Sequence, residues 1–369
     1  MAQSGHLQRL IRDRLLQVLM ALVLVLAICD PHAPRDYLHW LDLPTLAGLT
    51  GLLVLVQGVL TSGHLQRLAT HLVTRLRSVR ALALVLVLLA AALSSVLTND
   101  VALFLVVPLT IALDRIAAIP RQRLVIFEAL AVNAGSTFSP IGNPQNLLLW
   151  QHSGLGFFGY MAALAPTGAV LLVVLLVVCG FAFPAAPLRM HADAVATHRI
   201  DTPLLAGSLV LLAALVAALQ WGHAIPAALA VLAIGLVFFR RVLAGVDWLL
   251  LTFAAMFVGL GHLAALPAVQ AHVGTLGWGD PRALYAGGVV LSQAISNVPA
   301  TVLLQHYTAN VTLLAAAVNV GGSGLLIGSL ANLIALRLDG SRGIVWRFHV
   351  WSVPYLFVTA LLVALVLLR

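Results

Sequence analysis

Polar side chains and helix-breaking residues gather in one stretch of the chain whose flanking sequence is apolar. Five polar residues of the stretch AVNAGSTFSPIGNPQNLLLW (131–150) are candidate binding residues: Asn133, Ser136, Thr137, Asn143 and Asn146. The glycines and prolines between them are poor helix formers, and amide and hydroxyl groups are costly in hydrocarbon unless they are hydrogen-bonded. Backbone N–H groups at the start of a half-helix can hold an anion, and freed carbonyls opposite can hold a cation. This composition predicts a small-ion site inside an apolar environment.

A second stretch, AVNVGGSGLLIGSLANLIAL (317–336), repeats the first at a constant offset of 186. Eight of twenty positions are identical, and Gly142 pairs with Gly328. The repeat adds a second set of candidate binding residues: Asn319, Gly321, Ser323, Gly328, Ser329 and Asn332. Small residues that only allow close helix packing are the alternative interpretation. Because the interruption occurs twice, we favour a binding site built from both copies.

Two pairs of short apolar segments accompany these interruptions, 81–97 with 101–113 and 283–295 with 299–309. Each segment is near or below the ~17–25 residues that cross a bilayer, and each pair has a polar turn. The turns supply further candidate binding residues: Thr98, Asn99 and Asp100 in the first pair, Ser296 and Asn297 in the second. We predict re-entrant hairpins at 81–113 and 283–309, related by an offset of 198. Asn99 and Asn297 should then line one site near the membrane midplane.

Asp100 and Glu128 are the only acids inside the predicted membrane segments. Acids at such depth are energetically expensive and usually functional, so both are candidates for coupling to a proton or sodium ion. Neither is duplicated, because Val298 and Leu314 occupy the matching positions. An acid near the interface, paired with Arg123, is the alternative interpretation for Glu128.

Composition places these residues in a polytopic, all-α membrane protein. The 369 residues are 62% hydrophobic and 9% charged, unlike a soluble domain. About nine spans are predicted besides the two hairpins. They lie near 15–30, 43–61, 123–150, 161–184, 203–221, 225–239, 247–263, 311–337 and 349–368. Segments 123–150 and 311–337 are the broken helices, and the amphipathic segment 64–80 is expected to lie flat on the cytoplasmic face.

The offsets predict two repeats of opposite orientation. The first is 1–184, a cytoplasmic linker covers 185–202, and the second is 203–369. Inverted repeats with broken helices at matching positions are typical of secondary transporters, with alternating access around a central site.

Charge distribution predicts the orientation and excludes several function classes. With a cytoplasmic N-terminus, seventeen of the twenty arginines fall inside, as expected for a bacterial inner-membrane protein. The chain has no lysine, so a phosphate-binding loop is excluded, and uphill transport needs an ion gradient or a separate ATPase subunit. Cys29 and Cys179 are expected to be packed thiols, and we expect no metal, no cofactor and no nucleic-acid partner.

An intramembrane enzyme is a further alternative, because GGSG at 321–324 is similar to the nucleophile loop of rhomboid-type proteases. Such an enzyme needs a histidine base facing Ser323, and His349 is the nearest downstream candidate. The loop is part of the repeat, however, which argues against catalysis. An anion channel is the other alternative outside the transporter class.

At these residues the chain resembles the ion transporter superfamily, and most closely its citrate transporter-like anion permeases. The similarity is carried by TNDVALFLVVPLT and SPIGNPQN in the first copy and by SNVPA and IGSLAN in the second. The resemblance implies two inverted repeats, each with a hairpin and a broken helix, and a scaffold and transport domain in what is often a homodimer. In the dicarboxylate branch each hairpin tip reads Ser-Asn-Thr. Here Asp100 and Val298 replace both threonines, which is more similar to the arsenite permease and sodium/proton antiporter branch.

Together these observations predict an ion-coupled secondary transporter of a small inorganic or organic anion, arsenite-like or carboxylate. A sodium/proton antiporter is the alternative within the class.

Overall fold

The computed structural model describes residues 14–41, 43–76, 78–191, 200–238, 249–275 and 277–368. Within these ranges the regular structure is helical, and the only bridges between extended residues are two isolated ones. Five helices there are long and apolar enough to cross a membrane, or six if a pair bent by 53° at Leu266 counts as one span. The all-helical prediction is confirmed, whereas the number of nine spans stays a prediction.

The chain divides into two compact units that cut across the predicted repeats. The first unit contains residues 1–61 and 203–275, and the second contains 62–202 and 276–369. Each unit therefore takes one segment from each predicted half. The described residues 185–191 of the predicted linker belong to the second unit. The halves 1–184 and 203–369 were derived from the repeat in the sequence. That they form two inverted structural repeats stays a prediction.

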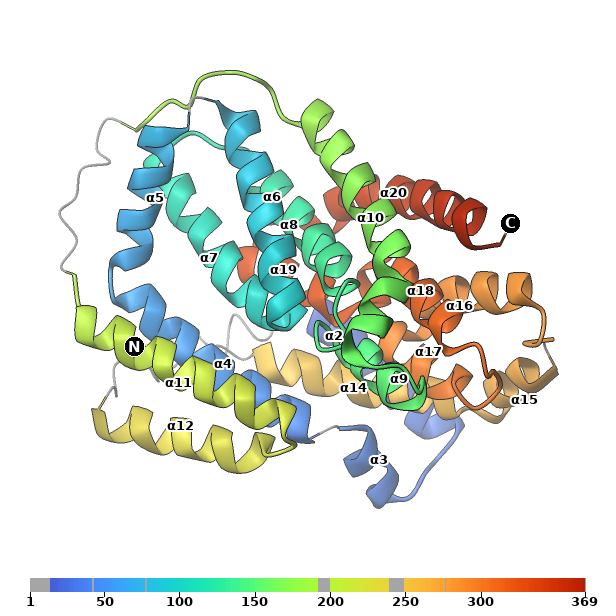
Figure 1. Ribbon diagram of the computed structural model, residues 1–369. Helices are drawn as coiled ribbons and strands as arrows, with labels where there is room; N and C mark the ends of the chain where they lie inside the picture. Colours follow the sequence, from blue (N-terminus) through green and yellow to red (C-terminus); the bar gives the residue numbers. More distant parts are fainter. Residues whose placement is uncertain are drawn as a thin grey trace. The chain divides into compact units, whose positions relative to one another are not determined.

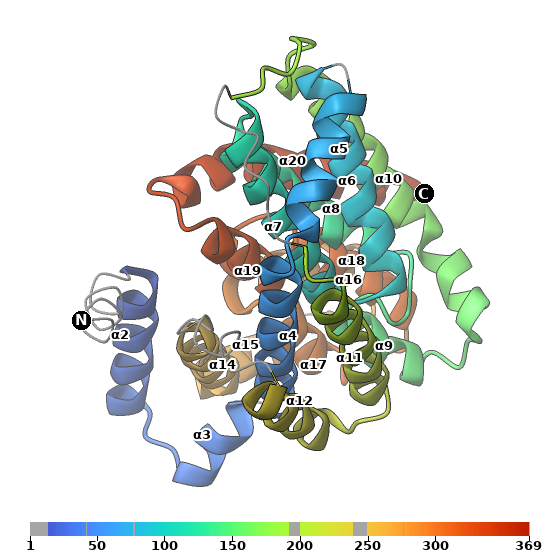
Figure 2. The ribbon, with the colours of Figure 1, turned by 90° about the vertical axis from the view of Figure 1, so that its left-hand side faces the viewer.

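The first unit is a helical bundle around α4 (Leu43–Thr61). Helices α12 and α14 contact α4, and α2 contacts α14 (Figure 2). The other elements of this unit are α2 (Arg14–Cys29), α3 (Pro34–Trp40), α11 (Thr202–Gln220), α12 (Ala224–Phe238), α14 (Leu249–Ala265) and α15 (Pro267–Thr275). Small residues allow the close packing: a methyl group at Gly58 would lie 2.3 Å from the Ser208 hydroxyl oxygen.

The second unit contains the interrupted helices and the predicted hairpins (Figure 1). Its first segment forms α5 (His64–Arg75), α6 (Val79–Val96), α7 (Asn99–Ile116), α8 (Arg121–Ser136), α9 (Pro144–His152) and α10 (Phe157–Ala182). Its second segment forms α16 (Pro281–Ile295), α17 (Asn297–Leu304), α18 (Val311–Gly321), the 3-10 turn η1 (Leu326–Gly328), α19 (Leu330–Asp339) and α20 (Ile344–Leu367). Both broken helices are thus interrupted, the first between α8 and α9 and the second between α18 and α19.

The hairpin arms differ in length from the sequence prediction. Helices α6 and α7 have 18 residues each, and α6 alone is long and apolar enough to span a bilayer. Their counterparts α16 and α17 have 15 and 8 residues. Helix α6 gains residues 79–80 at its start, and α7 gains 99–100 and 114–116 at its two ends, where polar or charged residues had ended the apolar count. Re-entry of either pair stays a prediction.

Side-chain caps explain where the helices near the interruptions begin. The hydroxyl groups of Thr98 and Ser329 accept hydrogen bonds from the first turns of α7 and α19. The Asn143 side chain caps α9, and Pro144 takes the first helical position, where the missing N–H costs nothing. Each cap satisfies a donor that hydrocarbon would leave unpaired.

Close helix crossings hold each predicted hairpin against its broken helix. A methyl group at Gly135 of α8 would lie 2.1 Å from the Ala91 carbonyl oxygen of α6. A methyl group at Gly321 of α18 would lie 2.6 Å from Ser292 Cβ of α16. Gly135 and Gly321 are counterparts in the repeat, so the same tight crossing is formed twice.

The described part of the predicted linker closes the first hairpin at its base. The Val79 N–H donates to the Ala186 carbonyl at 3.0 Å, and the Ala118 N–H donates to the Arg189 carbonyl at 2.9 Å. Isolated bridges join Ser78 to Pro187 and Ala117 to Met190. The segment 184–191 therefore ties the start of α6 to the end of α7.

Gly135→Val is expected to destabilise the protein, because the added side chain overlaps the backbone of α6 and overpacking costs about 1–3 kcal/mol or more. The measurement is the thermal unfolding midpoint of the purified protein in detergent. Gly180→Val is the matched control, since Gly180 also lies in a membrane helix (α10) and a Cβ there meets nothing within 4 Å. Equal midpoints for the two variants would contradict the close crossing.

Candidate functional site

Hydrogen bonds between asparagines join the two interruptions. Asn133, near the end of α8, donates from Nδ2 to Asn332 Oδ1 of α19 at 2.9 Å. The Ser329 hydroxyl donates to Asn133 Oδ1 at 3.1 Å. The last turn of the first half-helix in one copy therefore contacts the first turn of the second half-helix in the other.

The reciprocal contact is formed by the counterparts of these residues. Asn319 of α18 donates from Nδ2 to Asn146 Oδ1 at 2.6 Å, and Asn143 Nδ2 donates to Asn319 Oδ1 at 2.9 Å. Asn319 matches Asn133 at the offset of 186, and Asn143 and Asn146 match Ser329 and Asn332. The structure thus forms one arrangement of contacts twice, with the roles of the copies exchanged.

Within each interruption, a further asparagine satisfies backbone carbonyls that the helix leaves free. Asn146 Nδ2 donates to the Ser136 and Ser139 carbonyls at 3.1 and 3.0 Å. Asn332 Nδ2 donates to the Gly322 and Leu325 carbonyls at 2.9 and 3.3 Å. Unpaired carbonyls at membrane depth cost several kcal/mol each, so these bonds keep the interruptions stable.

The five asparagines of the interruptions are buried and saturated. Each is at most 3% exposed: Asn133, Asn143, Asn146, Asn319 and Asn332. A primary amide has two donor hydrogens and one acceptor oxygen, and each of these side chains uses both kinds of group within the protein. In this conformation they align the interruptions with one another.

Glycine is required where the chain turns inside each interruption. A Cβ at Gly142 would lie 2.6 Å from the Ser136 carbonyl oxygen and 2.9 Å from the Ser94 carbonyl oxygen. A Cβ at Gly328 would lie 2.9 Å from the Gly321 carbonyl oxygen. These approaches are closer than Cβ atoms tolerate, so even alanine forces the backbone apart.

Each predicted hairpin tip touches the interruption of its own copy. The Asn99 N–H, at the start of α7, donates to the Gly142 carbonyl at 2.8 Å. The Asn297 amide nitrogen lies 2.8 Å from the position that a Cβ of Gly322 would take. Ser296, which precedes α17, has a φ of 73°, a left-handed conformation that is unusual for a serine. A site shared by Asn99 and Asn297 stays a prediction.

The hydroxyl residues of the two copies have different partners. Thr137 Oγ1 donates to the Asn133 carbonyl at 2.8 Å, and Ser136 Oγ accepts from Asn143 at 2.9 Å. Ser323 Oγ is buried and has no hydrogen-bond partner among the described residues. Ser323 therefore differs from Ser136 and Thr137, whose hydroxyls are bonded within the protein.

The two buried acids each keep one oxygen without a partner. Asp100, in the first turn of α7, has no hydrogen bond to Oδ1 from the described residues. Glu128, fully buried in α8, accepts from the Thr110 hydroxyl through Oε1, while Oε2 has no partner there. Arg123 does not pair with Glu128, because it donates to the Ala182 carbonyl and lies over the rings of Phe183 and Trp351. The predicted alternative of a Glu128–Arg123 pair is therefore wrong.

Two side chains support the second interruption: Gln293, which sequence reasoning missed, and His349, which it considered only as a base for Ser323. Gln293 of α16 donates to the Gly321 carbonyl and accepts from the Leu325 N–H at 2.7 Å. His349 Nε2 of α20 accepts from the Leu326 N–H at 3.1 Å. Gln293 has no counterpart near the first interruption that would have marked it, because the matching position 95 is serine.

Arg121 is another structurally important residue, and sequence reasoning did not single it out. It donates to Asp339 Oδ1 at 2.8 Å, to Asp114 Oδ2 at 3.1 Å and to the Ser341 hydroxyl at 2.7 Å. These bonds join the start of α8 to the ends of α7 and α19. Its place at the N-terminus of the broken helix could have marked it. Its partners at the end of α19, however, are more than 200 residues away in the sequence.

An apolar groove of about 470 Å³ lies beside the first interruption, between α6 and α10. Its lining is hydrophobic apart from the hydroxyls of Ser95 and Ser139 and the backbone. Such an apolar surface suits an alkyl chain and not an ion. We therefore place the candidate ion site at the hairpin tips and the helix interruptions.

Apolar helices, two buried interruptions joined by amides and unpaired buried acids define a polytopic membrane protein that handles a small solute. The chain belongs to the citrate transporter family, whose model matches residues 9–312. It is therefore a transporter and not an enzyme. The geometry agrees, because His349 accepts a backbone N–H whereas the Ser323 hydroxyl has no partner among the described residues.

Relatives extend over nearly the whole chain. The inner membrane protein YbiR of Escherichia coli is 46% identical over 356 residues, covering 95% of this chain and 94% of its own. The uncharacterized transporter MJ0456 of Methanocaldococcus jannaschii is 32% identical, covering 89% of each chain. The silicon efflux transporter LSI3 of rice is 27% identical over 149 residues, covering 40% of this chain and 30% of its own. Together with the apolar helices, these matches make the chain an inner-membrane transporter.

A double-mutant cycle on Asn133 and Asn332 should reveal the link between the interruptions. Each single alanine variant leaves a buried amide unpaired, which costs about 1–3 kcal/mol, so the double variant should lose less stability than the sum. A coupling of about 0.5–2 kcal/mol is expected from the unfolding free energies in detergent.

The matched control pairs Asn332→Ala with Asn310→Ala, since Asn310 is an exposed asparagine that caps α18 and has no bond to Asn332. That pair should be additive. Additivity of the Asn133–Asn332 pair as well would contradict the link.

Proposed function

We propose that this protein is an ion-coupled secondary transporter that moves a small anion or oxyanion by alternating access. The observation that carries the proposal is the double, reciprocal asparagine link between the two helix interruptions. A packing role alone requires small residues, whereas here buried polar groups surround helix ends that can receive an ion.

The helix termini at the site favour a negatively charged ligand. Four helices begin there, α7, α9, α17 and α19. The bonds described above connect the first turns of α7, α9 and α19 to the interruptions, and α17 contacts α9. Each N-terminus carries a partial positive charge of about half an elementary charge, which is poorly screened away from water. The unpaired Ser323 hydroxyl and the amide of Asn297 would orient the ligand, and the asparagines of the interruptions would keep the helix ends in place.

Asp100 is the residue that we assign to coupling. Its position in the first turn of α7 stabilises the charged carboxylate, but its burial and its unpaired oxygen favour capture of a proton or a sodium ion. Charge neutralisation at this tip would lower its repulsion of an approaching anion. Binding of ion and substrate would then support each other, which is the requirement for coupled transport.

Small, oxygen-rich solutes are the proposed substrate class. The family is named for citrate, and LSI3 is a silicon efflux transporter, so both a carboxylate and an inorganic oxyanion have precedent among the similar proteins. The acidic tip, where the dicarboxylate branch has threonine, favours the inorganic oxyanion of the two. A homodimer is part of the proposal on resemblance alone.

A sodium/proton antiporter is the second candidate, and one observation favours it. Asp100 and Glu128 are both buried in the second unit, and each has an oxygen without a partner among the described residues. Two such carboxylates could exchange one sodium ion against protons without an anion.

Flux into proteoliposomes tests the proposed function. Arsenite, citrate and succinate are offered separately, each with an imposed proton or sodium gradient, and the internal concentration is compared with the external one. We expect one of these anions to accumulate above equilibrium under one of the gradients. Proton-for-sodium exchange without any anion would establish the antiporter, and only downhill movement would establish a channel.

Asp100→Asn is expected to retain substrate binding and downhill exchange but to lose gradient-driven accumulation, because the amide can neither take up a proton nor attract a cation. Uphill and exchange flux are measured in the same vesicles. Asp280→Asn is the control, since Asp280 is an exposed acid that caps α16 and asparagine also caps helices well. If Asp100→Asn still accumulates substrate with unchanged pH and sodium dependence, coupling belongs elsewhere, and Glu128→Gln is tested next.

A further inference from the structure

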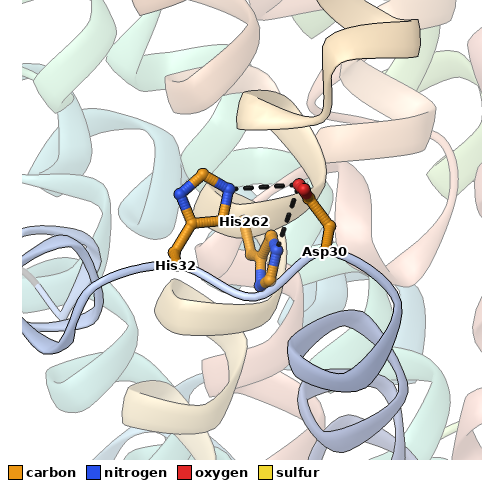
Figure 3. A group of neighbouring side chains, drawn as sticks. All are labelled: Asp30, His32 and His262. Atoms are coloured by element: carbon orange, nitrogen blue, oxygen red, sulfur yellow. Dashed lines mark hydrogen bonds and ion pairs between the residues drawn. The ribbon is translucent and has the colours of Figure 1, made fainter.

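Three side chains of the first unit converge at a place that the transport site does not involve. Asp30 and His32 follow α2, and His262 lies in the last turn of α14 (Figure 3). One ligand atom from each, a carboxylate oxygen and two imidazole nitrogens, lies within 4.8 Å of the others. His262 is about 230 positions away from Asp30 and His32 in the sequence, so no spacing motif indicates the cluster.

The distances are close to those of a metal centre. Asp30 Oδ2 lies 3.1 Å from His32 Nε2 and 3.6 Å from His262 Nε2. Ligands about 2.0–2.2 Å from a tetrahedral Zn²⁺ are separated by about 3.3–3.5 Å from one another. The remaining pair, one nitrogen from each histidine, lies within 4.8 Å.

His262 is the strongest indication of a missing ligand. Its side chain is fully buried, and neither ring nitrogen has a hydrogen-bond partner among the described residues. Its ring stacks on Trp40 with 4.8 Å between centroids, and it meets His32 edge-on at 4.9 Å. A buried imidazole without hydrogen bonds is costly, and a cation bound to Nε2 would remove that cost.

His32 is held as a metal-bound histidine usually is. While Nε2 faces the cluster, Nδ1 lies 3.6 Å from Asp36 Oδ2. The Asp36 carboxylate is itself fixed by the Ala33 N–H at 3.2 Å. A carboxylate behind the second ring nitrogen sets the tautomer and raises the basicity of the ligand.

Access and ligand number also fit an ion. His32 and Asp30 have side chains 27% and 29% exposed, so the cluster is open on one side while His262 closes the other. Three protein ligands leave a fourth position for water or another ligand.

We propose that Asp30, His32 and His262 bind a divalent transition-metal ion of the Zn²⁺ class. The ion would tie the segment after α2 to α14 within the first unit. This site is independent of the proposed transport function and departs from the sequence-based expectation that the chain binds no metal.

The test uses the full-length protein, purified in detergent and stripped with a chelator. Zn²⁺ binding is measured by equilibrium dialysis with metal analysis, and Co²⁺ is added as a visible probe of coordination. We expect one Zn²⁺ per chain and the visible absorption of a four-coordinate Co²⁺. Asp30→Asn and His32→Ala should each weaken binding at least about tenfold, and Asp36→Asn by about 10–100-fold, the usual effect of losing an outer-shell carboxylate.

His39→Ala is the matched control, since His39 is an exposed histidine of the same α3 segment outside the cluster. It should bind as the wild type does. His262→Gln tests the buried position. If this variant fails to fold, Asp30→Asn and His32→Ala, at half-buried positions, still test the site. If the wild type binds Zn²⁺ no more tightly than Asp30→Asn does, the metal site is overturned, and the residues form only a histidine–aspartate ion pair. Equal losses in His39→Ala and His32→Ala would also overturn it.

Discussion

A helix that stops inside a bilayer must hydrogen-bond its freed backbone groups within the protein, and the second unit is organised around that requirement. Asn146 and Asn332 bond the carbonyls that α8 and α18 leave free, and Asn133 and Asn319 join each interruption to the other. The close crossings at Gly135 and Gly321 then bring the hairpin arms against the same helices. Removing the amide network would leave these packed helices around unpaired polar groups.

The choice of side chain follows from what each group can donate and accept. A planar amide offers donors and an acceptor at one end, so two asparagines can satisfy each other and a carbonyl simultaneously. An ionised carboxylate only accepts, and it would repel the carbonyls that the asparagines bond. This difference separates the saturated asparagines from Asp100 and Glu128, each of which has an oxygen without a hydrogen-bond partner among the described residues.

Local features of the sequence predicted the elements well, whereas contacts between distant residues were beyond it. The span 43–61 coincides with α4, because polar residues bound the apolar run on both sides. Helix α20 starts five residues before the predicted 349, at Ile344, because Gly343 with φ of 78° ends the preceding turn, whereas the charged Arg347 had ended the apolar count. The asparagines were identified by type and repetition, but their mutual pairing depends on folding across almost 200 residues. His262 carries no sequence motif that links it to Asp30 and His32, and only the fold brings the three together.

The reciprocal asparagine link has a consequence for biosynthesis. The first interruption leaves the ribosome well before its partners, since Asn133 must wait for Ser329 and Asn332, and Asn143 and Asn146 must wait for Asn319. During translation of the intervening residues, its polar groups have to be sheltered by the insertion machinery or by water. Membrane integration of α8 and α9 is therefore completed only when the last part of the chain arrives, and truncation before residue 332 would leave an early segment unfinished.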